Sequence, residues 1–271
     1  MTPAWLAVRR GASPLLLSLP HTGTEIPPEI EAGLVSPWLA RKDTDWFIER
    51  LYAFAADLDA TIIRTSLSRT VIDVNRDPSG ASLYPGQATT ELCPTTTFDG
   101  EPLYRDGQAP DPADRRARWF DPYHAALQDE LARLRRLHPR VVLYDAHSIR
   151  SEIPRLFPGL LPHFNIGTHG GQACDPALQE RIEAICRGSG LSQVSNGRFR
   201  GGFITRAYGR PQDGVHAVQM ELACRAYLAE PVGPVDPATW PVPYDPDHAA
   251  PVRAALQDVL SACLAFGACP P

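Results

Sequence analysis

Residues 141–148, with the sequence VVLYDAHS, constrain the fold more than any other stretch of the chain. Four β-prone apolar residues are typical of a short buried strand, and the chain becomes polar at Asp145, so His147 is delivered to the carboxyl end of that strand. Open α/β sheets bind their ligands at this edge. Pro20-His21 follows the apolar run 15–19 in the same way. A lone histidine is more often a satisfied turn residue, but two that each end a buried strand can converge on one metal ion.

Length and composition narrow the class of protein. A chain of 271 residues with 44% hydrophobic residues can form one large α/β domain, so we expect a single domain over residues 1–271. The formal net charge of −5 argues against nucleic acid and anionic membranes as partners. Six cysteines without a C-x-x-C pair predict reduced structural thiols. The N-terminus lacks a signal pattern and no apolar run reaches the about 18 residues of a membrane span, so we expect a cytoplasmic protein.

Strand and helix patterns alternate along the chain, which predicts an α/β fold. The strand at 141 follows a long helix, so we expect it to lie parallel to its neighbours, and we expect Pro122 to kink or restart that helix. Residues 79–112 show no lasting period, and a loop this long usually serves function or forms a lid. Strands are predicted at 15–19, 60–64, 70–74, 141–144 and 215–220, helices at 43–58, 114–137, 176–187 and 249–266, and a Gly-rich turn into a short strand at 196–206.

The polar residues at the strand ends suggest a metal site. A catalytic zinc needs about three protein ligands of N or O type and one position for water. His21 and His147 supply two ligands, and Asp43, Asp45 or Glu25 could supply the third. An acid in the first turn of a helix can also serve only as a cap, so these alternatives stay open.

Glu221 ends an otherwise apolar run, where a carboxylate is costly unless it is hydrogen-bonded or acts as a general base. Arg76 directly follows the predicted strand 70–74, which indicates an anion site or a surface salt bridge. Arg69, Arg198 and Arg206 are alternatives for a second anion contact. These residues predict a site for a small anionic molecule beside the metal.

Several segments carry a family resemblance. They are PHTGTEIP (20–27), DTDWFIERLY (43–52), SRTVIDVNRDP (68–78), LYPGQATTELCPTTTFDGEPLYR (83–105), DAHSI (145–149), NGRFRGGFITRAYG (196–209) and QMELACRAY (219–227). Together they resemble the N-formylglutamate amidohydrolases, the deformylases of histidine degradation. The resemblance runs from about residue 13 to residue 228, and the motif at 83–105 is specific.

The resemblance implies a three-layer α/β/α sandwich with a mixed, mostly parallel sheet, similar to zinc carboxypeptidases and aspartoacylase. It implies one zinc ion, or another divalent metal, held by two histidines and one carboxylate, with His21 and His147 as the histidines. The carboxypeptidase pattern H-x-x-E would place a glutamate where this chain has Thr24. We therefore assign the third ligand to Asp45, because a D-x-D stretch accompanies the loop of this family.

The resemblance also implies hydrolysis of N-formyl-L-glutamate to formate and L-glutamate. Glu221 matches the catalytic glutamate that deprotonates water at the zinc, and Asn75 and Arg76 match the pair that grips a substrate carboxylate. Arg69 or Arg206 would then bind the second carboxylate. An amidohydrolase for another N-acyl amino acid remains an alternative, as does a metal-dependent binding protein without turnover, although a binding protein has no need of a base. The oligomeric state stays open.

Overall fold

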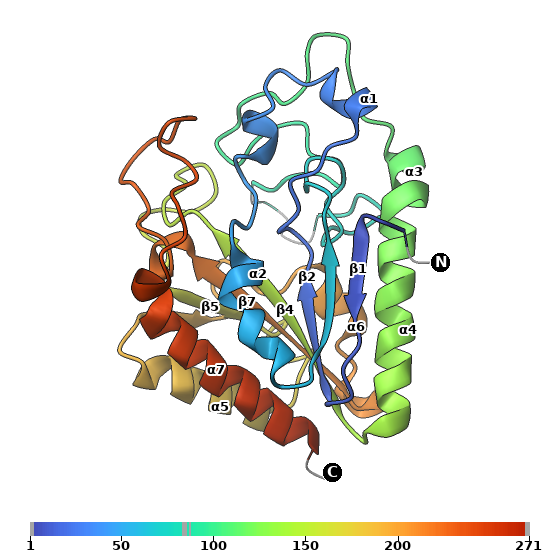
Figure 1. Ribbon diagram of the computed structural model, residues 1–271, viewed down its shortest axis with the longest axis vertical. Helices are drawn as coiled ribbons and strands as arrows, with labels where there is room; N and C mark the ends of the chain where they lie inside the picture. Colours follow the sequence, from blue (N-terminus) through green and yellow to red (C-terminus); the bar gives the residue numbers. More distant parts are fainter. Residues whose placement is uncertain (1–2, 83–85, 87, 269–271) are drawn as a thin grey trace.

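Seven strands form one mixed sheet in the computed structural model, which describes residues 3–82, 86 and 88–268. The sheet order is β1-β3-β2-β4-β7-β5-β6 (Figure 1). Four of the six neighbouring pairs in this described sheet are parallel, and β1–β3 and β5–β7 are antiparallel. The predicted mixed and mostly parallel sheet is confirmed. Its strands are β1 (Leu6–Arg9), β2 (Leu15–Leu19), β3 (Thr61–Thr65), β4 (Val141–Ile149), β5 (Phe164–Gly167), β6 (Gln193–Ser195) and β7 (Val215–Ala223).

Helices cover both faces of the sheet. α4 and α6 pack on one face, and α2, α5 and α7 pack on the other (Figure 1). The helices are α1 (Pro28–Glu31), η1 (Leu39–Arg41), α2 (Ile48–Leu51), η2 (Ala53–Ala56), α3 (Pro112–Arg115), the π-turn η3 (Arg116–Phe120), α4 (Asp121–Leu137), α5 (Pro176–Gly188), α6 (Phe203–Tyr208), η4 (Pro211–Asp213), η5 (Cys224–Ala226) and α7 (Pro246–Ala268).

Strand β2 shows why this sequence forms a sandwich. Successive side chains of a strand point to opposite faces. Leu15, Leu17 and Leu19 accordingly pack with α2, α5 and α7, whereas Leu16 packs with α4 and α6. All four leucines are buried, and each fully buried leucine contributes about 1.5–3 kcal/mol. A continuous apolar run is therefore needed to hold helices on both sides.

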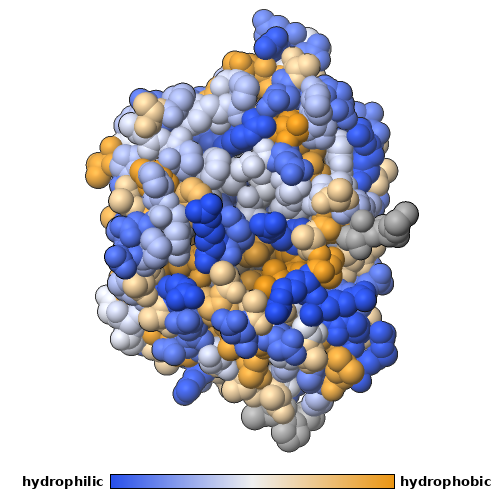
Figure 2. Space-filling view, viewed as in Figure 1, coloured by the Kyte–Doolittle hydropathy of each residue, from blue (hydrophilic) through white to orange (hydrophobic). Residues whose placement is uncertain are grey.

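Helix α7 is the one described helix long and apolar enough to cross a membrane, judged by length and composition alone. Its packing is that of a core helix. Val252, Leu256, Val259 and Cys263 are fully buried against the sheet, and Asp258 lies on the exposed side. Hydrophilic side chains cover most of the face in Figure 2, interrupted by hydrophobic areas near its middle.

The long helix has a π-turn directly before Pro122, where a kink or a restart was predicted. α3 leads through the π-turn η3 into α4 without a break, and Phe120 and Asp121 both have helical dihedrals. Pro122 cannot donate a helical hydrogen bond, and the π-turn lies directly before it. No helix or strand lies between β3 and α3 among the residues described, which include most of the predicted 79–112 loop. Positions 83–85 and 87 of that loop lie outside the described residues.

The predicted continuous helix over 43–58 is wrong. The structure has only the short α2 and η2 there, because Phe47 precedes α2 with a left-handed φ of 61°. Helical residues have φ near −63°, so a helix cannot continue through Phe47. Residues 43–45 are consequently left in irregular backbone, and their side chains are free to turn toward the sheet edge.

Two predicted strands are also wrong. Residues 70–74 form a turn and not a strand, in which the Asp73 carboxylate accepts a hydrogen bond from the main-chain nitrogen of Asn75 at 2.9 Å. Residues 196–206 lead into helix α6 and not into a short strand. In both segments the polar contacts of the site override the local preference for an extended chain.

Candidate active site

Three neighbouring parallel strands, β2, β4 and β7, bring the candidate residues to one edge of the sheet. His21 lies two residues beyond β2, and His147 is paired with Glu221 in the register of β4 and β7. β4 continues to Ile149 and β7 to Ala223, so the expectation that His147 and Glu221 lie at strand ends is corrected. Both residues are held inside the hydrogen-bonded ladder, which fixes the direction of their side chains.

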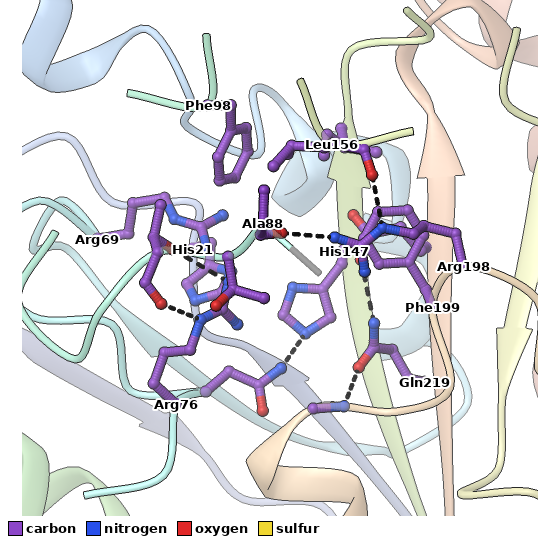
Figure 3. Close-up of a pocket in the computed structure, with 16 residues that line it drawn as sticks. His21, Arg69, Arg76, Ala88, Phe98, His147, Leu156, Arg198, Phe199 and Gln219 are labelled. Atoms are coloured by element: carbon purple, nitrogen blue, oxygen red, sulfur yellow. Dashed lines mark hydrogen bonds between the residues drawn. The ribbon is translucent and has the colours of Figure 1, made fainter. Parts of the chain in front are cut away.

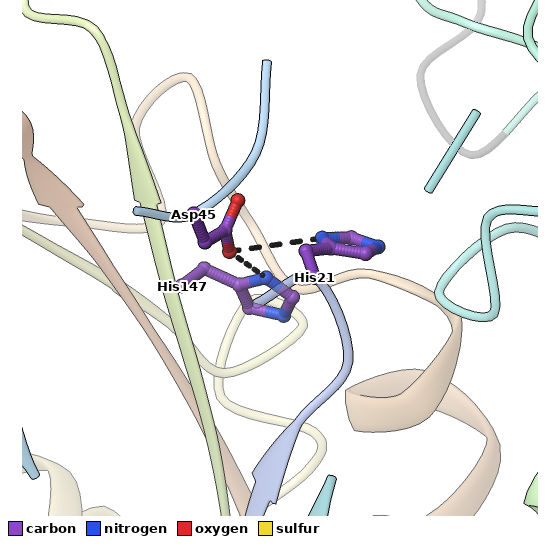
Figure 4. Close-up of side chains that lie close together, drawn as sticks. All are labelled: His21, Asp45 and His147. Atoms are coloured by element: carbon purple, nitrogen blue, oxygen red, sulfur yellow. Dashed lines mark hydrogen bonds and ion pairs between the residues drawn. The ribbon is translucent and has the colours of Figure 1, made fainter. Parts of the chain in front are cut away.

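Residues His21, Asp45 and His147 converge at this edge, and their potential ligand atoms lie within 4.8 Å of one another (Figure 4). The Oδ2 atom of Asp45 lies 3.1 Å from Nδ1 of His147 and 3.7 Å from Nδ1 of His21. The three residues are at most 2% exposed. Two imidazole nitrogens and one carboxylate therefore face a common point.

A separate carboxylate holds the other nitrogen of each histidine. Nε2 of His21 lies 2.7 Å from Oδ1 of Asp73, and Nε2 of His147 lies 2.9 Å from Oδ2 of Asp145. A histidine that binds a metal usually donates its second N–H to a carboxylate or a carbonyl, which fixes the tautomer and the ring orientation. In the neutral tautomer that carries its proton on Nε2, each histidine directs an Nδ1 lone pair at the common point.

The residues present fit a divalent metal. Nδ1 of His21 and Oδ1 of Asp45 are buried and have no hydrogen-bond partner. Such orphaned groups cost about 1–3 kcal/mol each unless something else satisfies them. Two imidazoles and a carboxylate are a usual ligand set of a catalytic zinc. His21, Asp45 and His147 are thus the residues that could hold the ion.

The structure places the alternative third ligands elsewhere. Asp43 accepts a hydrogen bond from the main-chain nitrogen of Phe98 at 2.7 Å. Glu25 accepts one from the Ser66 hydroxyl at 2.6 Å and is exposed. Of the three candidate carboxylates, Asp45 alone faces the two histidines.

Burial and neighbouring charges tune the site. Burial raises the pKa of Glu221 to about 7, and the nearby Asp45 carboxylate acts in the same direction against the effect of His147. A base with a pKa near neutrality is suited to proton transfer at physiological pH. Burial lowers the pKa of His147, but Asp145 and Asp45 outweigh it and raise that pKa well above its ordinary value. The same negative field favours a metal cation.

Glu221 is also held from its own strand. Nε2 of Gln219 donates to Oε2 of Glu221 at 3.0 Å, and Oε1 of Gln219 accepts from the main-chain nitrogen of Gly202 at 2.6 Å. A Cβ on Gly202 would lie 2.5 Å from the Asn75 side chain, so no larger residue fits there. Glycine at this position lets α6 approach the site closely.

A pocket opens beside His21 and His147 (Figure 3), and Glu221 is among the residues that line it. Its lining includes the cations Arg69, Arg76 and Arg198 together with hydrophobic side chains. Arg206 lies outside the lining, where its Nε donates to the carbonyl oxygen of Gly201 at 2.8 Å. Of the four arginines considered from the sequence, Arg69, Arg76 and Arg198 line the pocket and Arg206 does not. The hydrophobic lining residues are Ala88, Phe98, Ile149, Leu156 and Phe199.

The arginines beside the histidines share one carboxylate. Nη2 of Arg69 lies 2.5 Å from Oδ2 of Asp73, and Nη2 of Arg76 lies 3.7 Å from the same oxygen. These cations and His21 lower the pKa of Asp73 well below its ordinary value, although burial opposes them. Arg76 also donates from Nε to the carbonyl oxygen of Thr90 at 3.1 Å, which ties it to the long loop.

The side chain of Asn75 is engaged within the site. Its Nδ2 lies 3.1 Å from Oδ2 of Asp145 and 2.9 Å from Nε2 of His147, and its Oδ1 accepts from the Ile204 main-chain nitrogen at 2.8 Å. Asn75 lines the pocket as well. It links α6 to the carboxylate that supports His147.

A family model described as N-formylglutamate amidohydrolase matches residues 13–228. The chain is 48% identical to an N-formylglutamate deformylase of Pseudomonas aeruginosa and 46% identical to one of Pseudomonas putida, with 97% of each chain covered in both comparisons. The chain belongs to the N-formylglutamate amidohydrolase family. The resemblance read from the sequence is confirmed.

Solved structures support the same fold for this N-formylglutamate amidohydrolase family member. The N-formylglutamate amidohydrolase of Ralstonia eutropha JMP134 superposes with a TM-score of 0.76 at 21% identity, over 98% of both chains. A protein of Agrobacterium tumefaciens superposes with a TM-score of 0.70 at 17% identity, over 96% of this chain and 95% of that one. At these identities the likeness concerns the fold.

Sequence reasoning missed Asp73, Gln219 and Phe98 as parts of the site. Asp73 interrupts the apolar run VIDV, and a carboxylate in such a run is costly without a partner, so that signal was present. Gln219 lies two residues before Glu221 on the same strand, and residues i and i+2 share a face. Phe98 carries no comparable signal because it lies in the aperiodic loop.

The Asp145→Asn variant is expected to bind the metal about 10- to 100-fold more weakly. Asparagine keeps the size of Asp145 but removes the charge that orients His147. Competition against a chromophoric chelator measures the metal affinity of both proteins. An unchanged affinity would mean that Asp145 gives His147 no support as a ligand.

Proposed function

We propose that this family member is a zinc-dependent N-formylglutamate deformylase, which hydrolyses N-formyl-L-glutamate to formate and L-glutamate as the last step of a histidine degradation route. The proposal rests on the curated relatives that are named N-formylglutamate deformylase over nearly the whole chain. One structural observation carries it furthest. The Nδ1 atoms of His21 and His147 both face Asp45, beside the buried carboxylate of Glu221.

Each residue of the site has a proposed role in hydrolysis of the formyl amide. A divalent metal at the histidines would supply Lewis-acid chemistry, polarising the formyl carbonyl and making water more acidic. Glu221 takes the proton from the water whose oxygen bonds to the formyl carbon. The C–N bond then breaks, and Glu221 returns the proton to the departing amine nitrogen of glutamate. Gln219 keeps the Glu221 carboxylate in place through both transfers.

The arginines that line the pocket are proposed to select the substrate. The formyl group is small, so most binding energy must come from the dicarboxylate end of the substrate. Arg76 and Arg69 are proposed to bind these carboxylates, with Asn75 beside them. Arg198 lines the pocket and Arg206 does not, so Arg198 takes the place of Arg206 as the alternative partner for the second carboxylate.

The Arg76→Met variant is expected to raise KM for N-formylglutamate by roughly 10- to 150-fold, since a hydrogen bond to a charged group is worth about 1.5–3 kcal/mol. Methionine retains much of the apolar stem but cannot bind a carboxylate. Steady-state kinetics with N-formylglutamate and neutral N-formylglutamine measure the effect. Arg198→Met is the matched variant on another wall of the pocket.

The neutral analogue separates the two carboxylates. If Arg76 binds the γ-carboxylate, its loss removes the preference for N-formylglutamate over N-formylglutamine. If that preference survives while both substrates bind more weakly, Arg76 binds the α-carboxylate. Unchanged kinetics with both substrates would mean that Arg76 does not bind the substrate and has only a structural role, through its contacts with Asp73 and Thr90.

Metal analysis combined with formate release tests the function itself. The purified protein should contain zinc and release formate from N-formylglutamate, and N-acetylglutamate and N-formylaspartate should compete poorly as substrates. Release of acetate at a comparable rate would assign the protein to another N-acyl amino acid. Zinc without any turnover would support a binding protein.

The cytoplasm is the location that we propose. The five cysteines of the described residues, Cys93, Cys174, Cys186, Cys224 and Cys263, are buried and free, as reduced structural thiols should be. Cys269 lies outside the described part of the chain. Burial raises the pKa of Cys174 and Cys186 to about 12, which keeps both thiols protonated and unreactive.

A further inference from the structure

Asp43 and Asp45 lie two residues apart in irregular backbone, and their carboxylates point to different partners. Asp45 faces the two candidate histidine ligands. Asp43 accepts the Phe98 N–H through Oδ2 at 2.7 Å, and its Oδ1 lies 3.3 Å from Nη2 of Arg150. One short segment therefore contacts both the metal ligands and the loop that carries Phe98.

The loop 97–101 is held by a cluster of opposite charges. Asp99 lies 2.6 Å from Nζ of Lys42 and 2.6 Å from Nη2 of Arg150, and Glu101 lies 2.6 Å from the same Nζ. Lys42 is the only lysine of the chain and is 4% exposed. Lys42 and Arg150 are buried, whereas Asp99 and Glu101 are partly exposed. Loss of these contacts would leave the two buried cations uncompensated, which favours keeping the loop in place.

Phe98 is the residue that this loop presents to the pocket (Figure 3). Its ring lies 4.7 Å from the guanidinium carbon of Arg69, and the side chain is buried. Arg69 in turn pairs with Asp73, which supports His21. The ring keeps water from one side of this guanidinium, and ionic interactions are stronger where water is excluded.

We propose that Asp43 is a positioning residue, which together with Lys42 and Arg150 holds the loop 97–101 so that Phe98 forms a fixed wall of the substrate pocket. Asp43 acts through Phe98 and touches no reacting atom. Asp43 contacts this wall and Asp45 is a candidate metal ligand, and only Thr44 separates them in the chain. The short segment 43–45 therefore links the position of the wall to that of the metal ligands. The kinetic part rests on the proposed function, whereas the position of the loop can be measured without substrate.

Steady-state kinetics of the full-length enzyme test whether Asp43 holds Phe98 in place as a wall of the pocket. Asp43→Ala should raise KM for N-formylglutamate by about 10-fold, with kcat and zinc content little changed, because a hydrogen bond from Phe98 to a charged group is lost. Asp43→Asn retains an oxygen for the Phe98 N–H and should recover most of the loss. Combining Asp43→Ala with Phe98→Ala should raise KM no further than Phe98→Ala alone, since coupled residues are not additive.

Hydrogen exchange provides the readout that is independent of activity. The peptide covering residues 95–103 should exchange faster in Asp43→Ala than in the parent protein. Glu152→Gln is the matched control, because this exposed carboxylate lines the same surface hollow as Lys42 and Arg150. Its exchange and kinetics should match those of the parent protein.

Three results would overturn the proposal: unchanged exchange in Asp43→Ala, additive KM effects in the double variant, or loss of zinc from Asp43→Ala. Zinc loss would show that Asp43 acts on Asp45 and not on the loop. If the parent protein released no formate from N-formylglutamate while exchange in Asp43→Ala was faster, the proposed function would fail and the role of Asp43 in holding the loop would stand.

Discussion

Replacing Glu221 with glutamine is expected to lower kcat for formate release by about 10²–10⁴-fold, the usual worth of one general base. Glutamine has nearly the same shape and still offers an oxygen to Nε2 of Gln219, so the local structure should survive. It lacks the basic carboxylate that takes and returns the proton. Steady-state kinetics with N-formylglutamate measure the loss.

The Glu221→Gln variant should keep its zinc and its affinity for substrate, measured by metal analysis and by titration calorimetry with N-formylglutamate. This result would show that Glu221 acts in the chemical step and not in binding of the metal or the substrate. Turnover near that of the parent protein would leave Glu221 with a structural role and the mechanism without a base.

The His21→Ala and His147→Ala variants are each expected to lose the metal, and formate release with it. Each change removes one of the three candidate protein ligands, and His21, Asp45 and His147 are the described residues that form a potential metal-binding group there. The zinc content after dialysis against a mild chelator measures the effect. His163→Ala is the matched control, because this partly exposed histidine binds Ser192 at 2.7 Å and lies outside the pocket lining.

Stoichiometric zinc in either variant after dialysis would remove that histidine from the ligand set. Equal loss from the His163→Ala control would point to general destabilisation of the fold. Circular dichroism of all three variants distinguishes the two causes.

Strands with strong local signals were predictable from the sequence. The apolar runs that became β2, β4 and β7 are buried on both faces, so hydrophobicity alone marks them, and the histidines and Glu221 lie on or just beyond them. Parallel pairing then places their carboxyl ends at one edge. This reasoning needs only short-range patterns and general rules of topology.

The rest depends on contacts between distant parts of the chain. Asp45 meets His147 across 102 residues, and a left-handed Phe47 that no propensity indicates sets the backbone there. Asp73 lies in a turn because its carboxylate binds His21 and Arg69, although the run VIDV favours a strand. Arg198 and Arg206 could not be ranked, since only the folded loop shows which of them enters the pocket.

The placement of His147 and Glu221 inside the ladder of β4 and β7 bears on how new substrate preferences could arise in this family. These two residues, for which we propose roles in metal binding and proton transfer, lie on the sheet, whereas Thr90 and Phe98, which contact the pocket arginines, belong to a long irregular loop. Loops accept substitutions, insertions and deletions more readily than the strands that carry them. Mutations can therefore reshape the acyl or carboxylate subsites while the hydrolytic machinery stays intact, which makes this loop the natural starting point for directed evolution toward other N-acyl amino acids.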